Sequence, residues 1–413
     1  MSCRKGDSWP RAPRRSLART SRCKRPILAS LPIYGDDGMT QLLDPVALTQ
    51  KLVRMETINT PGHEDQCINF LAEILTQAGF TCRQVEFAPR RSSLVARIGR
   101  RGNGRLPLAF TGHVDVVPLG AAPWTQDPFG AEIIDGKMYG RGTADMKSGV
   151  AAFTAAAIDM AAQLTDSSGV TLIITAGEET GCEGAAHLVE QPEIRDLMGT
   201  AGAFIVAEPT SNQPLLGHKG ALWLKLRAKG VTAHGSMPEH GDNAIYKIAA
   251  AAVALQHFDF ACPPHPLMGS PTLNVGVING GINVNSVPDA AEILVDIRSV
   301  AGQRHRDIIE RVRGVVGSEI DIETLIDLES VYTQPTDEWA RQVSESCPDG
   351  PTSRIVSYFT DAAVLREPLG APPTLILGPG DSHMAHQTDE YCVVDRITEA
   401  RDIYANAIRQ WCL

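Results

Sequence analysis

The sequence predicts an α/β fold in which a larger domain with a mostly parallel sheet carries a smaller inserted domain. The chain has 413 residues, more than one core of average size accommodates, so two domains are expected. Four apolar runs lack alternation, as strands buried on both faces of a parallel sheet do. Between the last two runs the sequence follows the order β-α-β-β-α-β, which is that of a ferredoxin-like unit.

The apolar runs and the helices beside them define the larger domain. The four runs cover residues 106–110, 170–176, 203–207 and 374–377. An amphipathic first helix is expected at 42–55, and the alanine-rich stretch 143–162 predicts a helix that packs closely on the sheet. Because the fourth run returns to the character of the first three, the stretch before it is interpreted as an insertion.

The inserted domain is predicted to cover residues 219–328. Its expected strands are 221–228, 272–277, 291–298 and 320–326, and its expected helices are 243–256 and 304–315. The first of these strands alternates between apolar and polar residues, which is typical of a strand with one buried face. Residues 39–218 and 329–413 then form the two parts of the larger domain.

The N-terminal segment 1–38 differs from the rest of the chain. Its first 26 residues hold nine Lys and Arg but a single acid, Asp7. This composition is typical of a transit peptide, a disordered arm or translation from an upstream start, and Met39 opens ordinary globular sequence. We interpret residues 1–38 as a basic, disordered arm.

Composition excludes several classes of partner. The formal net charge of -10 argues against a nucleic-acid partner, which needs a clustered positive surface. The chain has no apolar run of 18 residues and no secretory signal, so no membrane partner is expected. Nine scattered cysteines without a C-x-x-C pair indicate reduced thiols and a cytoplasmic protein. Dinucleotide-binding and P-loop motifs are absent.

A histidine and an aspartate two residues apart form a natural metal-binding pair, because they point to the same side of an extended segment. The pattern occurs five times in this chain, so spacing alone identifies nothing. Only His113 and Asp115 directly follow a buried apolar run. In an open α/β sheet, ligands gather beyond the carboxyl ends of the strands. This pair is therefore the candidate.

The other three apolar runs also lead into side chains that bind metal ions. The second is followed by Glu178 and Glu179, the third by Glu208, and the fourth by a glycine-rich turn towards His383 and His386. Each side chain has an ordinary explanation as a polar residue at a strand end. Together they predict a cluster at one edge of the sheet.

Asp145 lies in the glycine-punctuated segment 140–147, which opens the alanine-rich helix. An acid in a first helical turn is also favoured by the helix dipole alone. Histidines, carboxylates and a bridging aspartate nevertheless suit zinc or a similar divalent ion in a two-metal hydrolytic site. Asp145 is the candidate bridge.

Six segments, in order along the chain, carry a resemblance to a known family. They are Gly112-His113-Val114-Asp115, residues 124–129, residues 140–147, Glu178-Glu179-Thr180-Gly181, Glu208-Pro209-Thr210, and Gly378-Pro379-Gly380 with Ala385-His386. From about residue 40 onward the chain resembles the dinuclear zinc deacylases and peptidases of the M20 type. The resemblance implies a mostly parallel-sheet zinc-peptidase catalytic domain with an inserted ferredoxin-like dimerisation domain.

The resemblance assigns the metal ligands. It implies that one ion is held by His113 and Glu208, that the other is held by Glu179 and His386, and that Asp145 bridges them. Two divalent ions per subunit are expected, most suitably Zn²⁺, which Co²⁺ can replace.

The resemblance also implies roles for residues that bind no metal. Asp115 is expected to orient the ring of His113. Glu178 is expected to act as general base towards a metal-activated water. His234 would supply the oxyanion donor. Asn285 and Arg298 would hold the substrate carboxylate, which an Arg fork fits.

A homodimer through the inserted domain is implied as well, in which each His234 serves the active site of the partner chain. His218 and His383 have no counterpart in the family pattern and are left without a role.

The implied activity is hydrolysis of the amide bond of a small N-acyl amino acid. Residues 360–362 and 380–391 resemble acetylornithine deacetylase, an enzyme of arginine biosynthesis, more closely than succinyl-diaminopimelate desuccinylase. The desuccinylase, and a carboxypeptidase or dipeptidase of the same family, remain alternatives, since the fold fixes neither acyl group nor side chain. A non-catalytic binding protein would be marked by loss of Glu178 or a ligand, and none is lost.

Overall fold

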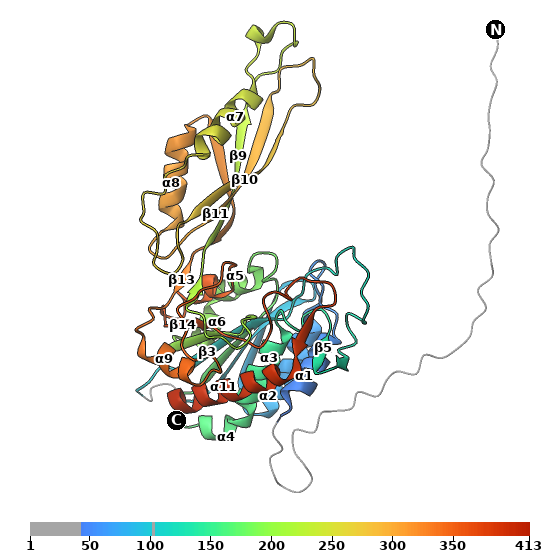
Figure 1. Ribbon diagram of the computed structural model, residues 1–413, viewed down its shortest axis with the longest axis vertical. Helices are drawn as coiled ribbons and strands as arrows, with labels where there is room; N and C mark the ends of the chain where they lie inside the picture. Colours follow the sequence, from blue (N-terminus) through green and yellow to red (C-terminus); the bar gives the residue numbers. More distant parts are fainter. Residues whose placement is uncertain (1–42, 101–103) are drawn as a thin grey trace, which may run out of the picture. The chain divides into compact units, whose positions relative to one another are not determined.

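A six-stranded sheet forms the centre of the larger part of the molecule (Figure 1). A computed structural model describes residues 43–100 and 104–413, so the predicted arm 1–38 lies outside the described residues. In sheet order the strands are β1 (Thr81–Ala88), β2 (Arg91–Ile98), β6 (Val170–Thr175), β3 (Leu108–His113), β7 (Ala203–Val206) and β14 (Thr374–Ile376).

The four apolar runs are confirmed as the parallel part of this sheet. Strand β3 pairs in parallel with β6 and β7, and β7 pairs in parallel with β14. Strands β1 and β2, which the sequence analysis missed, add an antiparallel edge. Strand β1 is half exposed and polar, and β2 buries polar side chains such as Arg91 and Arg97, so neither shows a continuous apolar run.

Helices cover both faces of this sheet. On one face lie α1 (Pro45–Val53), α3 (Lys147–Asp159) and α11 (Val394–Cys412). On the other lie α5 (Glu183–Glu190), α6 (Pro192–Met198) and α10 (Ala362–Leu365). The aromatic ring of Phe110 in β3 contacts Phe153 of α3 and Tyr404 of α11, which ties both helices to the sheet.

The predicted alanine-rich helix is confirmed, but it begins later than expected, at Lys147. Its close packing explains a glycine in β3. A Cβ at Gly112 would lie 2.7 Å from the Met146 side chain and 2.9 Å from the Val150 side chain. Glycine at this position therefore lets α3 approach the strand that ends at His113.

Smaller elements complete this part of the fold. They are α2 (Asp65–Gln77), α4 (Ala161–Leu164), α9 (Glu338–Glu345), the two-stranded sheet β8 (Gly217–His218) and β13 (Val331–Tyr332), and the three-stranded sheet β4 (Ile133–Ile134), β5 (Lys137–Tyr139) and β15 (Tyr391–Val393). Strands β8 and β13 flank the predicted insertion in sequence and pair with each other. The domain boundaries themselves stay a prediction.

The inserted stretch forms a four-stranded antiparallel sheet of ferredoxin-like order, as predicted. Its strands are β9 (Ala221–Lys229), β10 (Thr272–Gly280), β11 (Ala290–Arg298) and β12 (Ile320–Leu328), arranged β10-β11-β9-β12. The helices α7 (Ala244–Leu255) and α8 (His305–Val316) bury their apolar sides against it. A short 3₁₀ turn, η1 (Pro238–His240), follows β9.

Within the described residues, no helix is both long enough and apolar enough to cross a membrane.

Candidate metal centre

The carboxyl ends of the parallel strands bring the predicted ligands together. His113 is the last residue of β3, Glu178 and Glu179 follow β6, and Glu208 follows β7. The loop after β14 leads to His386. Since β3, β6, β7 and β14 run in parallel, all of these residues lie at one edge of the sheet.

Asp145 lies between two histidine–carboxylate pairs. The Nε2 atom of His113 lies 3.2 Å from Asp145 Oδ1 and 3.8 Å from Glu208 Oε1. The Nε2 atom of His386 lies 3.1 Å from Glu179 Oε2 and 3.5 Å from Asp145 Oδ2. The side chains that were expected to share an ion thus lie close together, and Asp145 lies between the two pairs, while their roles as ligands stay a prediction.

The donor set fits divalent metal ions. Ligand atoms of His113, Asp145 and Glu179 all lie within 4.8 Å of one another. Imidazole nitrogens and carboxylate oxygens are ligands that zinc accepts. The acids are also buried close to one another, with Glu178 5% and Glu208 4% exposed. Buried like charges are costly unless a cation compensates them, so the site itself favours bound cations.

The pKa values express this crowding. Burial raises the pKa of Glu178 and of Glu208 well above the ordinary glutamate range, and neighbouring carboxylates add to the effect. Burial acts against ionisation of Asp145, but hydrogen bonds with His113 and His386 lower its pKa. Hydrogen bonds with Asp145 and Glu179 raise the pKa of His386 to about 10. The contacts of Asp145 and Glu179 with the two histidines thus offset part of the repulsion among the acids.

A buried acid that the sequence analysis missed, Glu390, holds the loop of Asp145. Its carboxylate accepts hydrogen bonds from the backbone N–H groups of Gly142, Ala144 and Asp145, at 2.7 to 3.1 Å. It also forms an ion pair of 2.6 Å with Arg141. The segment 140–145 is therefore a fixed turn and not the first turn of a helix. Its position in the sequence, beside the half-buried Asp389, gave no sign of this role.

Asp115 differs from the expectation. The Nδ1 atom of His113 makes its 2.9 Å hydrogen bond with the backbone carbonyl of Asp115, while the carboxylate is 3.6 Å away. The carboxylate instead accepts hydrogen bonds from the backbone N–H groups of Glu178 and Glu179, both at 3.2 Å, and from Asn59 Nδ2 at 3.0 Å. Asp115 thus holds the turn that carries two site glutamates, and its main chain orients the ring.

The remaining predicted residues, His234, Asn285 and Arg298, lie in different parts of the inserted domain. His234 lies beside Asn285, since the two segments form a bridge and Gly235 N donates to Asn285 O. Arg298 is at the other end of β11 and forms a 3.0 Å ion pair with Asp296. Asn285 and Arg298 of one chain therefore lie in different parts of the inserted domain, and their role in holding the substrate carboxylate stays a prediction.

A cavity of about 420 Å³ contains the cluster. Its lining residues are Asp145, Glu178, Glu179, Glu208, Pro209, Trp223, Tyr358, Phe359, Ser382, Ala385 and His386. The charged lining residues had been predicted from the sequence, whereas the three aromatic lining residues had not. His234, Asn285 and Arg298 do not line this cavity. Trp223 lies six residues before the end of β9, so the strand carries the chain roughly 20 Å away from it before His234 is reached.

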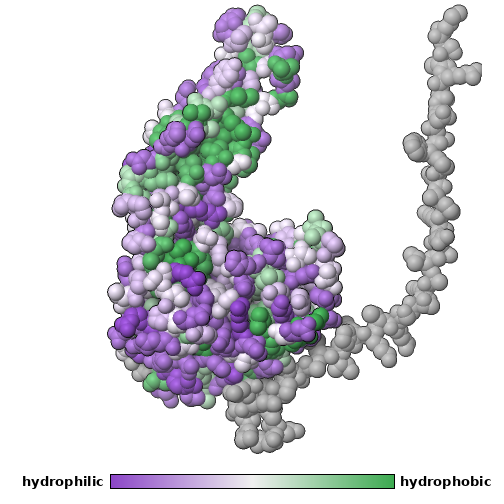
Figure 2. Space-filling view, viewed as in Figure 1, coloured by the Kyte–Doolittle hydropathy of each residue, from purple (hydrophilic) through white to green (hydrophobic). Residues whose placement is uncertain are grey.

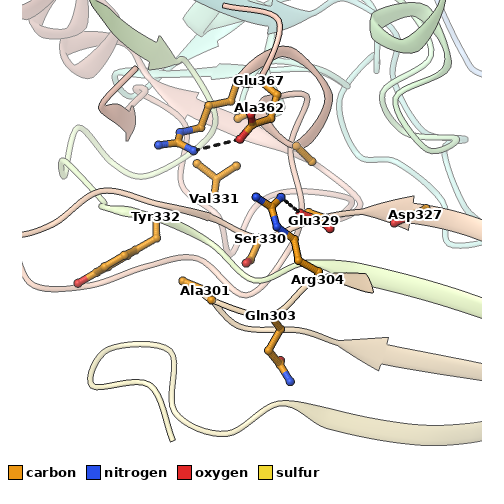
Figure 3. A pocket seen from close by; sticks show the side chains of 13 residues that line it. Ala301, Gln303, Arg304, Asp327, Glu329, Ser330, Val331, Tyr332, Ala362 and Glu367 are labelled. Carbon is orange, nitrogen blue, oxygen red and sulfur yellow. Dashed lines mark hydrogen bonds and ion pairs between the residues drawn. The ribbon is translucent and has the colours of Figure 1, made fainter. Parts of the chain in front are cut away.

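A larger cavity, of about 520 Å³, lies elsewhere, beside β12, β13 and α10 (Figure 3). Its arginines already have acidic partners, since Arg304 pairs with Glu329 at 2.7 Å and Arg366 with Glu367 at 3.8 Å. It contains none of the predicted site residues. The smaller cavity is therefore the candidate site.

The two unassigned histidines lie outside the cluster. His218 is buried in β8, and burial lowers its pKa to about 4, so the ring is neutral. His383 lines a neighbouring cavity with Arg354 and Asp381. Neither contacts a predicted ligand within the described part of the chain.

Comparison with known proteins gives a consistent result. The pattern of peptidase family M20/M25/M40 matches residues 109–410. Acetylornithine deacetylase of Proteus mirabilis is 31% identical over 389 residues, which cover 89% of this chain and 97% of that protein. Succinyl-diaminopimelate desuccinylase of Cereibacter sphaeroides is 34% identical over 400 residues, covering 89% and 99%.

Solved structures share the fold. An M20 metallo-carboxypeptidase from Sulfolobus solfataricus matches with a TM-score of 0.69 at 18% identity, over 89% of this chain and 99% of that one. A dinuclear metal-binding M20 peptidase from Bacillus subtilis matches with a TM-score of 0.64 at 16% identity, over 89% and 97%.

Replacing Asp115 by Asn tests its role in holding the glutamate turn. The amide cannot accept both backbone hydrogen bonds, so the turn loosens, and we expect metal affinity to fall by about 10–100-fold, the usual effect of removing a support of a ligand. Asn59→Ala, which does not touch His113, should change the affinity in the same direction. The measurement is calorimetric titration of the metal-free protein with Zn²⁺.

Asp321→Asn is the matched control, because Asp321 forms only an exposed pair with Lys229 on the inserted sheet. If metal affinity is unchanged in both Asp115→Asn and Asn59→Ala, the turn of Glu178 and Glu179 does not depend on Asp115 for its conformation.

Proposed function

Because the chain belongs to peptidase family M20/M25/M40, we propose that it hydrolyses the amide bond of a small N-acyl amino acid with two divalent metal ions, most suitably Zn²⁺. The observation that carries the proposal is the position of Asp145 between the His113/Glu208 and His386/Glu179 pairs. Co²⁺, which accepts the same nitrogen and oxygen ligands, can replace zinc.

The metal ions supply Lewis acidity, which lowers the pKa of water and polarises an amide carbonyl. Glu178 is the general base in this proposal. It follows the ligand-bearing strand β6, lines the cavity and is 5% exposed. Burial raises its pKa well above the ordinary glutamate range, which makes its carboxylate more basic towards the proton of the attacking water, and the protonated acid can then return that proton to the leaving amine.

His234 is proposed as the donor that stabilises the oxyanion. Its Nδ1 atom contacts Ser236 Oγ at 2.8 Å, which leaves Nε2 free to face a ligand. Because β9 separates His234 from the cavity of its own chain, we assign it to the cavity of a partner chain. Asn285 lies beside His234, so it would reach the same cavity of the partner chain. Arg298 would bind the carboxylate of the substrate held in its own chain.

Exposed apolar side chains on the inserted domain support a homodimer. On α7, Tyr246 is 75% and Val253 65% exposed, and in the segment after β10 Ile282 and Val284 are fully exposed. Figure 2 shows hydrophobic surface gathered over this unit. Strand β10 is also the edge of its sheet. A two-fold pair of these domains would cover both the edge and the apolar surface.

The names of the relatives suggest specific substrates. N-acetylornithine would make this a cytoplasmic enzyme of arginine biosynthesis, and N-succinyl-diaminopimelate or a dipeptide would give it another role. The support is identity of 31% and 34% to a deacetylase and a desuccinylase respectively. Pocket residues decide between them, because the fold does not.

Metal-dependent amide hydrolysis tests the proposal directly. The Zn²⁺-loaded protein should release free amine from N-acetyl amino acids faster than from dipeptides with the same side chains. Removing the metal with a chelator should abolish the reaction, and Zn²⁺ or Co²⁺ should restore it. Faster hydrolysis of the dipeptides would make it a peptidase instead.

Glu178 and Glu179 are adjacent but are proposed to do different work. Glu178→Ala should keep two bound metal ions per chain and lose roughly 10²–10⁴-fold in kcat, the usual effect of losing a general base. Glu179→Ala should lose metal as well, because Glu179 contacts His386 at 3.1 Å. Elemental analysis and turnover of both variants make the comparison, and equal metal loss would remove Glu178 from the base role.

A mixed dimer tests whether His234 serves the partner chain. Homodimers of His234→Ala and of Glu178→Ala should both be nearly inactive. In the hybrid, the chain with His234→Ala keeps Glu178 and its ligands, and its partner lends an intact His234. One complete site of two should restore up to about half of wild-type activity. The two variants are co-expressed with different tags, and a hybrid as inactive as both parents would rule out the exchange.

A further inference from the structure

Three aromatic side chains form a wall of the cavity that holds the metal-ligand cluster. Trp223 comes from β9 of the inserted domain, and Tyr358 and Phe359 come from the segment before α10. Pro209 and Ala385 complete this wall. We call these five residues the aromatic wall.

The polar atoms of the aromatic wall are already engaged. The Tyr358 hydroxyl donates to the Pro209 carbonyl at 3.0 Å, and the Trp223 indole N–H donates to Asp296 Oδ1 at 3.1 Å. Both rings are thereby fixed in position. What they offer a ligand is their carbon surface.

The substrate carboxylate is assigned to Asn285 and Arg298, and no side chain of this chain that lines the cavity is left to bind a second charged group. Every charged residue that lines it belongs to the metal-ligand cluster or is the proposed base. The six other lining residues are Pro209, Trp223, Tyr358, Phe359, Ser382 and Ala385. An ammonium group buried against them would lose water without gaining a carboxylate partner, which is unfavourable.

An aromatic ring can also attract a cation through its face, and a free carboxylate beside Trp223 would add to that attraction. The acid that accepts from the indole, Asp296, is already ion-paired with Arg298 at 3.0 Å. The pair carries no net charge, so it offers no free carboxylate to an ammonium group on the cavity side.

From these contacts we propose that the substrate carries an uncharged, apolar group that packs against the aromatic wall. The inference rests on the proposed amide hydrolysis and narrows its substrate class to N-acyl amino acids with an apolar side chain or apolar acyl chain. A cavity of about 420 Å³ accommodates a ligand of that size. Ornithine and diaminopimelate derivatives, which place charges at their far ends, are the wrong substrates for this wall.

Two substrate series on the Zn²⁺-loaded wild-type protein test the inference and show which group meets the wall. One series varies the side chain of N-acetyl amino acids over leucine, phenylalanine, alanine and ornithine. The other varies the acyl chain of N-acylalanine over acetyl, butanoyl, hexanoyl and succinyl. We expect kcat/KM to rise by roughly 10–200-fold from the small to the apolar member in at least one series, the usual discrimination of an apolar pocket.

Trp223→Ala should reduce this discrimination, lowering the kcat/KM ratio of the apolar to the alanine substrate by about tenfold or more. Trp223→Phe should restore most of it, because the ring surface is kept. Phe359→Ala provides a second variant on a different segment, should Trp223→Ala unfold. Thermal unfolding and metal content of each variant confirm that the cluster is intact.

The outcomes separate the two proposals. If N-acetylornithine and N-succinylalanine are the better substrates of their series, the apolar class is overturned while amide hydrolysis stands. If no amide is hydrolysed, the proposed function fails, and calorimetric binding of leucine and ornithine to the metal-loaded protein decides the inference separately. Ornithine binding as tightly as leucine would then overturn it.

Discussion

The structure depends on one electrostatic constraint, the convergence of buried carboxylates at the carboxyl edge of the parallel sheet. Asp145, Glu178, Glu179 and Glu208 meet there beside His113 and His386, with Glu178 and Glu208 buried and the other two acids mostly so. Such a cluster is unfavourable without compensating charge. Divalent cations supply that compensation, so the burial that destabilises the acids also makes them a metal site. Burial further raises the pKa of Glu178, which suits it for proton transfer.

The same constraint explains two acids that touch no ligand atom directly. Asp115 accepts the backbone N–H groups of Glu178 and Glu179, and Glu390 accepts those around Asp145. Each fixes a loop that would otherwise spread under repulsion between its neighbours. Because these hydrogen bonds go to backbone N–H groups, they position a predicted ligand residue and leave its side chain free to bind an ion. These supports give the cluster its geometry before any ion binds.

The inserted domain carries residues with proposed functions towards both ends of strand β9. At one end Trp223 completes the aromatic wall, and beyond the other lies His234 with Asn285. A rigid strand keeps these two groups apart within one chain. Under the two proposals, the insertion would shape substrate choice in its own subunit and offer an oxyanion donor to another. Both uses follow from strand length and from the ferredoxin-like order that leaves β10 at an edge.

The sequence by itself determined the parallel strands, the ferredoxin-like insertion and the charged members of the cluster. Apolar runs and strand ends are local features, and the parallel pairing of the strands places their ends together. Strand β2 was missed because its polar residues become buried only through contacts with distant segments such as Glu64 and Thr171. Strand β1 was missed because it is half exposed and polar. Tertiary structure alone decided the hydrogen bonds of Asp115 and Glu390, the separation of Asn285 from Arg298, and the aromatic wall. The contacts of Glu390, for example, join segments up to 249 residues apart, and no local sequence pattern shows which segments meet.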